Sequence, residues 1–159
     1  MVPDAIDLAS IRRVLVIKLR HHGDVLLASP VFQVLKNHAP HLEIDALVYH
    51  DTCDMLTLHP AVSQIHAVDR KWRTLGAVAQ LRAEWGLRRT LRSRRYDLIV
   101  HLTDAPRGAW LARTLGARYA VARKLPGRGR WWAGSFTHLY PHPIATPRHT
   151  VELHLDALR

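Results

Sequence analysis

One segment near the amino terminus sets the architecture of this chain: Val14-Leu15-Val16-Ile17-Lys18-Leu19-Arg20-His21-His22-Gly23-Asp24-Val25. Its first four residues are apolar and mostly β-branched, which is typical of a short buried strand. A polar turn with several cations, one glycine and one carboxylate follows, and then an apolar segment with helical spacing begins. A strand, a loop and a helix in this order open an α/β domain, in which ligands bind at the carboxyl end of the strand.

Strands and helices are predicted to alternate along the rest of the chain. Apolar runs predict further strands at 43–49, 64–68, 96–102, 119–121 and 136–140. Helical spacing predicts helices at 29–39, 51–58, 74–93 and 105–115, and a last helix from residue 150. This alternation predicts βαβ units, and therefore a Rossmann-like, doubly wound α/β fold with a mostly parallel sheet.

Individual residues set several of these boundaries. Proline is tolerated in the first turn of a helix or at a kink, so Pro30 places the regular start of the first helix near Ser29, after an irregular turn. Asp51 is predicted to cap the short helix that follows the second strand. The predicted buried side of the helix at 74–93 consists of Leu75, Val78, Leu81, Trp85 and Leu91. Glycines and prolines predict a loop over 125–134. Three prolines precede the last helix: Pro141, Pro143 and Pro147.

The composition is that of one globular domain. The chain has 159 residues, of which 48% are hydrophobic and 23% charged, enough for a sizeable core. No apolar run reaches the ~20 residues needed to span a bilayer, and the first residues show no secretory signal. The single cysteine, Cys53, fits a reducing compartment and is interpreted as a small buried apolar residue.

The net charge of +10 favours a polyanionic partner: nucleic acid, an anionic membrane surface or a phosphorylated substrate. The cations are dispersed along the chain, which is weaker evidence for DNA binding than a single basic helix or arm. The first loop lacks a G-x-G-x-x-G pattern, and the chain has no P-loop, which argues against NAD binding and against a P-loop nucleotide site. The twelve histidines and one cysteine show no zinc-site spacing, so neither a metal nor a cofactor is predicted.

Residues 18–24 resemble the first loop of the bacterial lipopolysaccharide heptosyltransferases, and most of all the branch that adds the third heptose. The resemblance continues over almost the whole chain in Ile44-Asp45 with Tyr49, Asp51-Thr52, Met55-Leu56, Gln64-Ile65, Val68-Asp69-Arg70-Lys71-Trp72, Arg94-Arg95-Tyr96-Asp97-Leu98 and His149-Thr150-Val151-Glu152. The first loop and residues 69–72 together are specific evidence for this family, whereas either segment alone would be weak evidence. Family members are glycosyltransferases of family 9 with GT-B architecture, in which two Rossmann-like domains face a cleft.

This resemblance implies a domain organisation and a set of partners. Residues 1–148 are expected to form the amino-terminal, acceptor-binding domain, and residues 149–159 to begin the interdomain connecting helix. The carboxyl-terminal domain that holds ADP-heptose is absent, so the chain is interpreted as an excised domain or a truncated gene product, inactive by itself. The implied reaction is an inverting, metal-independent transfer of heptose to the lipopolysaccharide inner core. The implied location is cytoplasmic, in peripheral contact with the anionic inner membrane, with no nucleic acid bound.

Asp24 has two interpretations. From the residues alone it is a helix N-cap after a glycine turn. The resemblance implies that it is the catalytic base, which takes a proton from the attacking hydroxyl of the acceptor. Carboxylates, with a pKa of ~4, are weak bases for a sugar hydroxyl, so this proton transfer is expected late, when the anomeric carbon is already oxocarbenium-like.

The remaining candidate residues would bind the substrate. Gly23 is expected to permit a positive φ and a close approach of the backbone to a ligand. Histidines are expected to donate hydrogen bonds to the acceptor, and arginine and lysine to bind phosphate groups of the acidic inner core. These candidates are Lys18, His21, His22, Arg70, Lys71, Arg73, Asp104, Arg107, Arg128 and Arg130. For each of them, a solvated turn or surface residue is the competing interpretation.

Two further alternatives stay open. A different sugar acceptor within the same family would leave the same motifs in place. A basic nucleic-acid-binding module would account for the charge, but no helix-turn-helix, zinc finger or aromatic RNA-binding motif supports it. The helix predicted at 74–93 is basic and amphipathic, and either lies near an anionic membrane or presents a solvated side.

Overall fold

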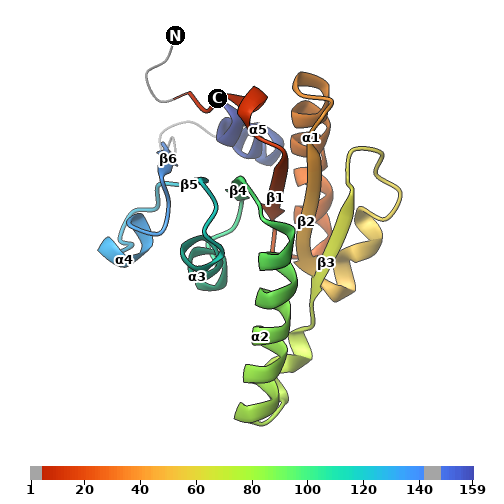
Figure 1. Cartoon of the computed structure of the whole chain (residues 1–159), viewed down its shortest axis with the longest axis vertical. Helices are drawn as coiled ribbons and strands as arrows, with labels where there is room; N and C mark the ends of the chain where they lie inside the picture. Colours follow the sequence, from red (N-terminus) through yellow and green to blue (C-terminus); the bar gives the residue numbers. More distant parts are fainter. Residues whose placement is uncertain (1–4, 142–147) are drawn as a thin grey trace.

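The computed structural model of the chain describes residues 5–141 and 148–159, and its centre is a six-stranded parallel sheet (Figure 1). The strands are β1 (Arg13–Ile17), β2 (Glu43–Tyr49), β3 (Gln64–Val68), β4 (Leu98–His101), β5 (Tyr119–Arg123) and β6 (His138–Tyr140). They lie in the order β3-β2-β1-β4-β5-β6, and neighbouring strands pair in parallel. The predicted Rossmann-like α/β fold is confirmed.

Helices cover both faces of this sheet. Side chains alternate along the central strand, so that Val14 and Val16 belong to one core cluster, and Leu15 and Ile17 to the other. The first face carries α1 (His22–His38) and α5 (Thr150–Leu155), and the second carries α2 (Ala77–Arg94), α3 (Pro106–Leu115) and α4 (Arg130–Ala133). Short 3₁₀ helices connect these elements: η1 (Leu8–Ser10), η2 (His50–Met55), η3 (Arg70–Thr74) and η4 (Asp156–Leu158).

Most of the predicted elements lie where the sequence places them. The second and third strands have the predicted bounds, and the last helix begins at Thr150 as expected. The third helix, α3, ends at Leu115, and Gly116 follows it as a C-cap with a φ of 72°, in the left-handed region that favours glycine. Four helical regions differ from the predictions.

The first helix begins at His22, not near Ser29, so no irregular turn precedes it and Pro30 lies inside it. Proline removes one hydrogen bond from the helix ladder. Near this break, the carbonyl of Leu27 accepts a hydrogen bond from Nδ1 of His154 at 3.1 Å. The helix continues because apolar side chains on both sides of the proline are buried: Val25, Ala28, Val31, Phe32 and Leu35. Their burial outweighs the lost bond.

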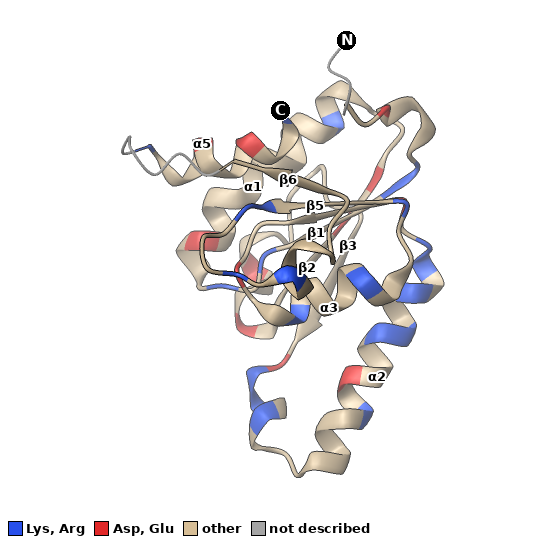
Figure 2. Cartoon of the chain, turned by 90° about the vertical axis from the view of Figure 1, so that its left-hand side faces the viewer, with Lys and Arg blue, Asp and Glu red and all other residues tan. Residues whose placement is uncertain are grey.

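The prediction of the buried side of α2 is wrong, except at Leu91. The helix buries Leu87 and Leu91. The exposed fractions of Leu75, Val78, Leu81 and Trp85 are 43%, 75%, 67% and 61%. In two perpendicular views, α2 extends beyond the ends of the strands, so its first half has no layer of the fold to pack against (Figures 1 and 2). None of the helices in the described ranges is long and apolar enough to cross a membrane.

The other differences are local. The turn after β2 is a 3₁₀ helix that Asp51 does not cap, and Asp51 instead pairs with Nε of Arg70 at 3.2 Å. The segment 125–134 contains α4, because the indole of Trp132 is buried in the second core cluster. Two of the predicted chain-breaking prolines lie outside the described residues: Pro143 and Pro147.

A buried carboxylate fixes the end of α2 to the sheet. Asp45 of β2 accepts hydrogen bonds from Nε of Arg94 at 2.8 Å and from the hydroxyl of Tyr96 at 2.7 Å. Burial acts to raise the pKa of Asp45, but hydrogen bonds from His66, Arg94 and Tyr96 outweigh it and hold the pKa at about 2. The carboxylate is therefore ionised at neutral pH and ties the carboxyl-terminal turn of α2 to the second strand.

A buried imidazole occupies the space between β4 and α3. The ring of His101 stacks on Phe136 with 5.6 Å between ring centroids and lies 5.6 Å from the Trp132 ring. Burial lowers the pKa of His101 to about 4, which keeps the ring neutral. A Cβ atom at Gly108 would lie 2.0 Å from Cε1 of His101. The glycine is therefore required for this close approach of α3 to the ring.

The Gly108→Ala variant is expected to be less stable than the parent by about 1–3 kcal/mol, because the added methyl overpacks the core at His101. Gly86→Ala is the matched control, since a Cβ there meets no atom within 4 Å in the middle of α2. That control is expected to raise the free energy of unfolding by about 0.5–1 kcal/mol. Urea denaturation measures both changes, and equal stability of the two variants would contradict the close packing.

Candidate functional site

The order of the strands places a crevice between β1 and β4. The chain continues from β1 toward β2 and from β4 toward β5, on opposite sides, and ligands of open α/β sheets bind at this point outside the carboxyl ends of the strands. The last residues of the two strands, Ile17 and His101, lie opposite each other. The loop that carries residues 18–21 therefore leaves the sheet beside the loop at 102–105.

A pocket of about 290 Å³ opens at this crevice. Its lining residues are Leu19, Arg20, His21, Tyr49, Arg70, Thr103, Asp104 and Ala105. They lie at the carboxyl ends of four neighbouring strands, β1 to β4. This convergence makes the pocket the candidate functional site.

Thr103 fixes the two central loops relative to each other. Its Oγ1 accepts a hydrogen bond from the backbone N–H of Leu19 at 3.0 Å and donates to the carbonyl of Ile17 at 3.5 Å. Above it, Nη2 of Arg20 lies 3.8 Å from a carboxylate oxygen of Asp104. The backbone of the pocket is therefore preformed by contacts between loops that are distant in sequence.

Arg70 forms one wall of the pocket and is held on three sides. Its Nε pairs with Asp51, its Nη2 donates to the carbonyl of Arg20 at 3.2 Å, and its guanidinium carbon lies 3.7 Å from the centre of the Tyr49 ring. The next cations, Lys71 and Arg73, are exposed and do not line the pocket. The predicted cluster thus divides into one fixed arginine in the site and two cations outside it.

Asp104 forms the opposite wall and gathers further cations. One carboxylate oxygen accepts from Nη2 of Arg123 at 3.0 Å, and the backbone carbonyl accepts from Nη2 of Arg128 at 2.8 Å. Arg107 pairs instead with Glu84 of α2, on the second face of the sheet, and does not reach the pocket.

Asp24 is the third residue of α1, and His21 is the N-cap, so the cap interpretation of Asp24 is wrong. The carboxylate is half-buried in the first turn of the helix, whose positive dipole end favours a negative charge. Gly23 does not have the predicted positive φ, but a Cβ there would meet no atom within 4 Å, so its backbone faces open space. The side chains of His21 and His22, which precede Gly23, are exposed. The remaining candidate, Arg130, is exposed at the start of α4.

Lys18 is buried and links three elements instead of facing the pocket. Its Nζ donates to the carbonyl of Leu102 at 3.0 Å and to Nε2 of His154 at 2.9 Å. Nδ1 of His154 donates to the carbonyl of Leu27 in α1. Burial lowers the pKa of His154, which keeps its ring neutral and Nε2 able to accept, and burial also lowers the pKa of Lys18 to about 8. This position differs from the predicted substrate contact.

Three residues of this region are not among the predicted site residues: Thr103, Tyr49 and His154. The first two lie at the carboxyl ends of β4 and β2, so a search of all strand ends would find them. The link between Lys18 and His154 spans 136 positions of the chain and leaves no local signal.

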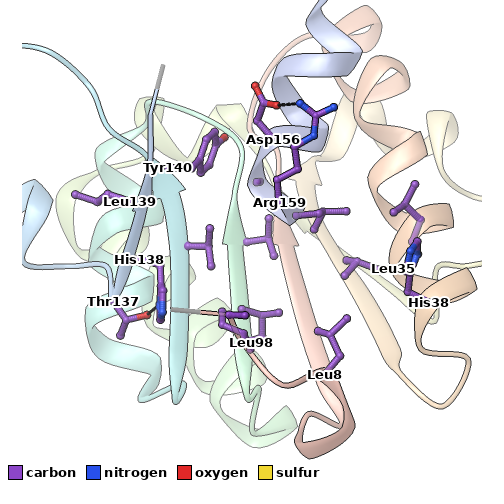
Figure 3. A pocket seen from close by; sticks show the side chains of 17 residues that line it. Leu8, Leu35, His38, Leu98, Thr137, His138, Leu139, Tyr140, Asp156 and Arg159 are labelled. Carbon is purple, nitrogen blue, oxygen red and sulfur yellow. Dashed lines mark hydrogen bonds and ion pairs between the residues drawn. The ribbon is translucent and has the colours of Figure 1, made fainter. Parts of the chain in front are cut away.

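A larger cavity of about 520 Å³ lies beside α1 and η4 (Figure 3). Apolar side chains such as Leu35 and Leu98 line much of it, and an ion pair between Asp156 and Arg159, at 2.8 Å, closes one end. It contains no candidate residue from the sequence and does not lie where strands converge at their carboxyl ends. Within the described ranges, no group of three or more His, Cys, Asp and Glu side chains is placed to hold a metal ion.

The buried link predicts a specific pH dependence. The pKa of Lys18 is about 8 in the folded chain against an ordinary 10.5, so the unfolded chain binds more protons between these values and the parent gains stability as the pH rises. Lys18→Met lacks this gain. The stability of the parent relative to the variant is expected to grow by about 1 kcal/mol from about pH 7 to about pH 9. Urea denaturation at both pH values measures the difference, and parallel pH profiles would exclude a buried, charged Lys18.

Comparison with curated proteins identifies relatives of one kind, although no family model matches the chain. Lipopolysaccharide heptosyltransferase 3 of Escherichia coli K12 is 36% identical over 141 residues, which are 88% of this chain and 40% of the relative. Lipopolysaccharide heptosyltransferase 1 of Pseudomonas aeruginosa is 28% identical over 142 residues, with the same two shares. The chain therefore spans about two fifths of the length of these relatives.

Solved structures share the fold. The glycosyl transferase family 9 structure from Veillonella parvula has a TM-score of 0.79 and 21% identity, covering 97% of this chain and 42% of that one. Escherichia coli heptosyltransferase WaaC with ADP-2-deoxy-2-fluoro heptose has a TM-score of 0.75 and 23% identity, covering 92% and 47%. The resemblance predicted from the first loop is thus confirmed by sequence, and the solved structures show the shared fold. Over 88% of its length, this chain is similar to a part of the lipopolysaccharide heptosyltransferases.

Proposed function

We propose that this chain is the acceptor-binding domain of a glycosyltransferase that moves heptose from ADP-heptose to the lipopolysaccharide inner core. The observation that carries the proposal is the pocket at the switch point, which is lined by His21, the N-cap of α1, and by the fixed guanidinium of Arg70. Asp24 lies in the first turn of α1, three residues after His21, and does not itself line the pocket. Relatedness to lipopolysaccharide heptosyltransferase 3 supports the kind of reaction. In this proposal residues 1–148 hold the acceptor, and residues 149–159 begin the connection to the domain that holds the donor.

Asp24 acts as the general base in this reaction. The acceptor hydroxyl oxygen attacks the anomeric carbon of ADP-heptose, a new glycosidic bond forms, and the bond to the diphosphate breaks. ADP leaves with the electron pair from the opposite side, which inverts the configuration at the carbon. The carboxylate receives the hydroxyl proton late in this step, because carboxylates are weak bases until the hydroxyl has been acidified by attack.

Arg70 recognises an anionic group of the acceptor. Its contacts with Asp51 and with the Arg20 carbonyl use Nε and Nη2, so they leave Nη1 for an oxygen of a phosphate. The stacking on Tyr49 fixes the plane of the guanidinium before a ligand arrives. The acceptor is a membrane lipid, and we therefore place the reaction at the cytoplasmic face of the inner membrane.

The base is tested with Asp24→Asn in a protein that carries this sequence together with a donor domain. We expect kcat for heptose transfer to fall roughly 10²–10⁴-fold while acceptor affinity changes little, because the amide keeps the shape but accepts no proton. Asp54→Asn, an exposed carboxylate in η2, is the control and keeps the parent rate. A folded Asp24→Asn variant with a near-parent kcat would contradict the assignment.

The 159-residue chain alone is expected to transfer no heptose.

The acceptor site is tested by comparing Arg70→Ala with Lys71→Ala and Arg73→Ala. Each variant removes one positive charge from the same turn, but only Arg70 lines the pocket. In calorimetry with phosphorylated core oligosaccharide, we expect Arg70→Ala to weaken binding by about 1–3 kcal/mol and the other two variants by much less. Dephosphorylated oligosaccharide should remove this difference. Equal losses in all three variants would show general charge attraction instead of a contact in the pocket.

A further inference from the structure

The outward side of α2 is apolar over the first half of the helix. Val78, Leu81 and Trp85 follow one another at helical spacing and therefore share one side, and all three are exposed. Leu75, in the extended segment that precedes α2, is exposed as well. Three large apolar side chains on one side of a helix indicate an interaction site, unlike a single exposed leucine.

Cations border this apolar surface. The arginines of α2 are Arg82, Arg88, Arg89, Arg92 and Arg94. Arg82 and Arg89 lie three and four positions from Trp85 and so on the same side of the helix. The guanidinium carbon of Arg88 lies 5.0 Å from the centre of the Trp85 indole ring. The acidic side chain of the helix, Glu84, is paired with an arginine of α3. Basic segments accordingly follow one another along α2 in Figure 2.

This surface lies on the same side of the sheet as the pocket. The chain runs from the carboxyl end of β3 through Arg70, a wall of the pocket, and reaches the first turn of α2 at Ala77. The start of α2 lies beyond the strand ends in both views (Figures 1 and 2). At its other end the helix is tied to the sheet by Arg94 and Asp45. Whatever binds the start of α2 is therefore held on the side of the sheet at which the pocket opens.

We propose that the outward side of α2, formed by Val78, Leu81, Trp85, Arg82 and Arg89, docks on the surface of an anionic phospholipid bilayer. The proposal rests on the proposed function, in which the acceptor is a lipid. Apolar side chains would enter the headgroup boundary, where tryptophan is favoured, and arginines would bind lipid phosphates. A bilayer supplies an apolar interior and negative charge together, which matches the two components of this surface.

The test uses the 159-residue chain and cosedimentation with vesicles that contain no lipopolysaccharide. Vesicles of equimolar phosphatidylglycerol and phosphatidylethanolamine are expected to bind the parent, and binding should weaken as salt is added. Vesicles of phosphatidylcholine alone should bind at least about tenfold more weakly. The double variant Leu81→Gln, Trp85→Gln should lose about tenfold or more in partitioning. Arg82→Gln, Arg89→Gln should lose about tenfold on the anionic vesicles only.

A matched control removes the same two residue types elsewhere on the surface. Leu58 and Trp131 are 94% and 49% exposed, and Leu58→Gln, Trp131→Gln should bind vesicles as the parent does. Equal losses in this control and in the α2 variant would overturn the proposal, as would a parent that binds no anionic vesicles. Self-association without vesicles that the α2 variant abolishes, measured by sedimentation velocity, would assign the surface to a second copy and also overturn it.

The proposed function is read out separately, through calorimetry with soluble core oligosaccharide in the absence of vesicles. If the chain binds vesicles but not the oligosaccharide, the proposed acceptor site is contradicted and the proposed membrane surface is retained. Failure of vesicle binding with acceptor binding intact would overturn only the docking of α2.

Discussion

The pairing of β1 with both β2 and β4 is the constraint on which the rest of the structure depends. The five residues of β1 lie at the centre of the sheet, and the backbone pairing continues just past the end of this strand. The N–H of Lys18 donates to the carbonyl of Leu47, and the N–H of Leu102 donates to the carbonyl of Ile17. At the end of β1 the chain leaves the sheet between β2 and β4. The connection that follows β1 runs to one side of the sheet, and the connection that follows β4 runs to the other. The position of the pocket therefore follows from backbone pairing before any side chain is considered.

This constraint explains why the sheet was predictable and the packing of α2 was not. Strands covered on both faces appear in the sequence as continuous apolar runs, and each run here is short and bounded by turn residues. Helical periodicity shows only which residues share a side of the helix. In α2 two sides carry apolar residues, Val78 with Trp85 and Leu87 with Leu91, and the sequence does not tell which side meets the sheet. The answer depends on how far the helix extends past the strand ends.

The candidate site divides in the same way. The place of the first loop, between the end of β1 and the start of a helix, was predictable from local apolar patterns. Its details were not, because α1 begins at His22 and Gly23 does not have a positive φ. The directions of the long side chains could not be predicted from the sequence. Lys18 turns inward to His154, and Arg107 turns to Glu84, because partners distant in sequence compete with the pocket for them. Arg70 is the converse case, since Tyr49 and Asp51 hold it in the pocket.

The same division accounts for the positive charge. At the pocket, Arg70 and Arg123 are oriented by the carboxylates of Asp51 and Asp104, which fixes their hydrogen-bond donors in space and reduces their net field. Fixed donors select a ligand by geometry. On α2, Arg82 and Arg89 are exposed on flexible stems beside apolar side chains, and charges of this kind attract any extended anionic surface in a salt-dependent manner. The net charge of +10 thus contains fixed cations at the pocket and exposed cations on α2, which a sum over the chain does not separate. Only the placement of each cation relative to its nearest carboxylate separates them.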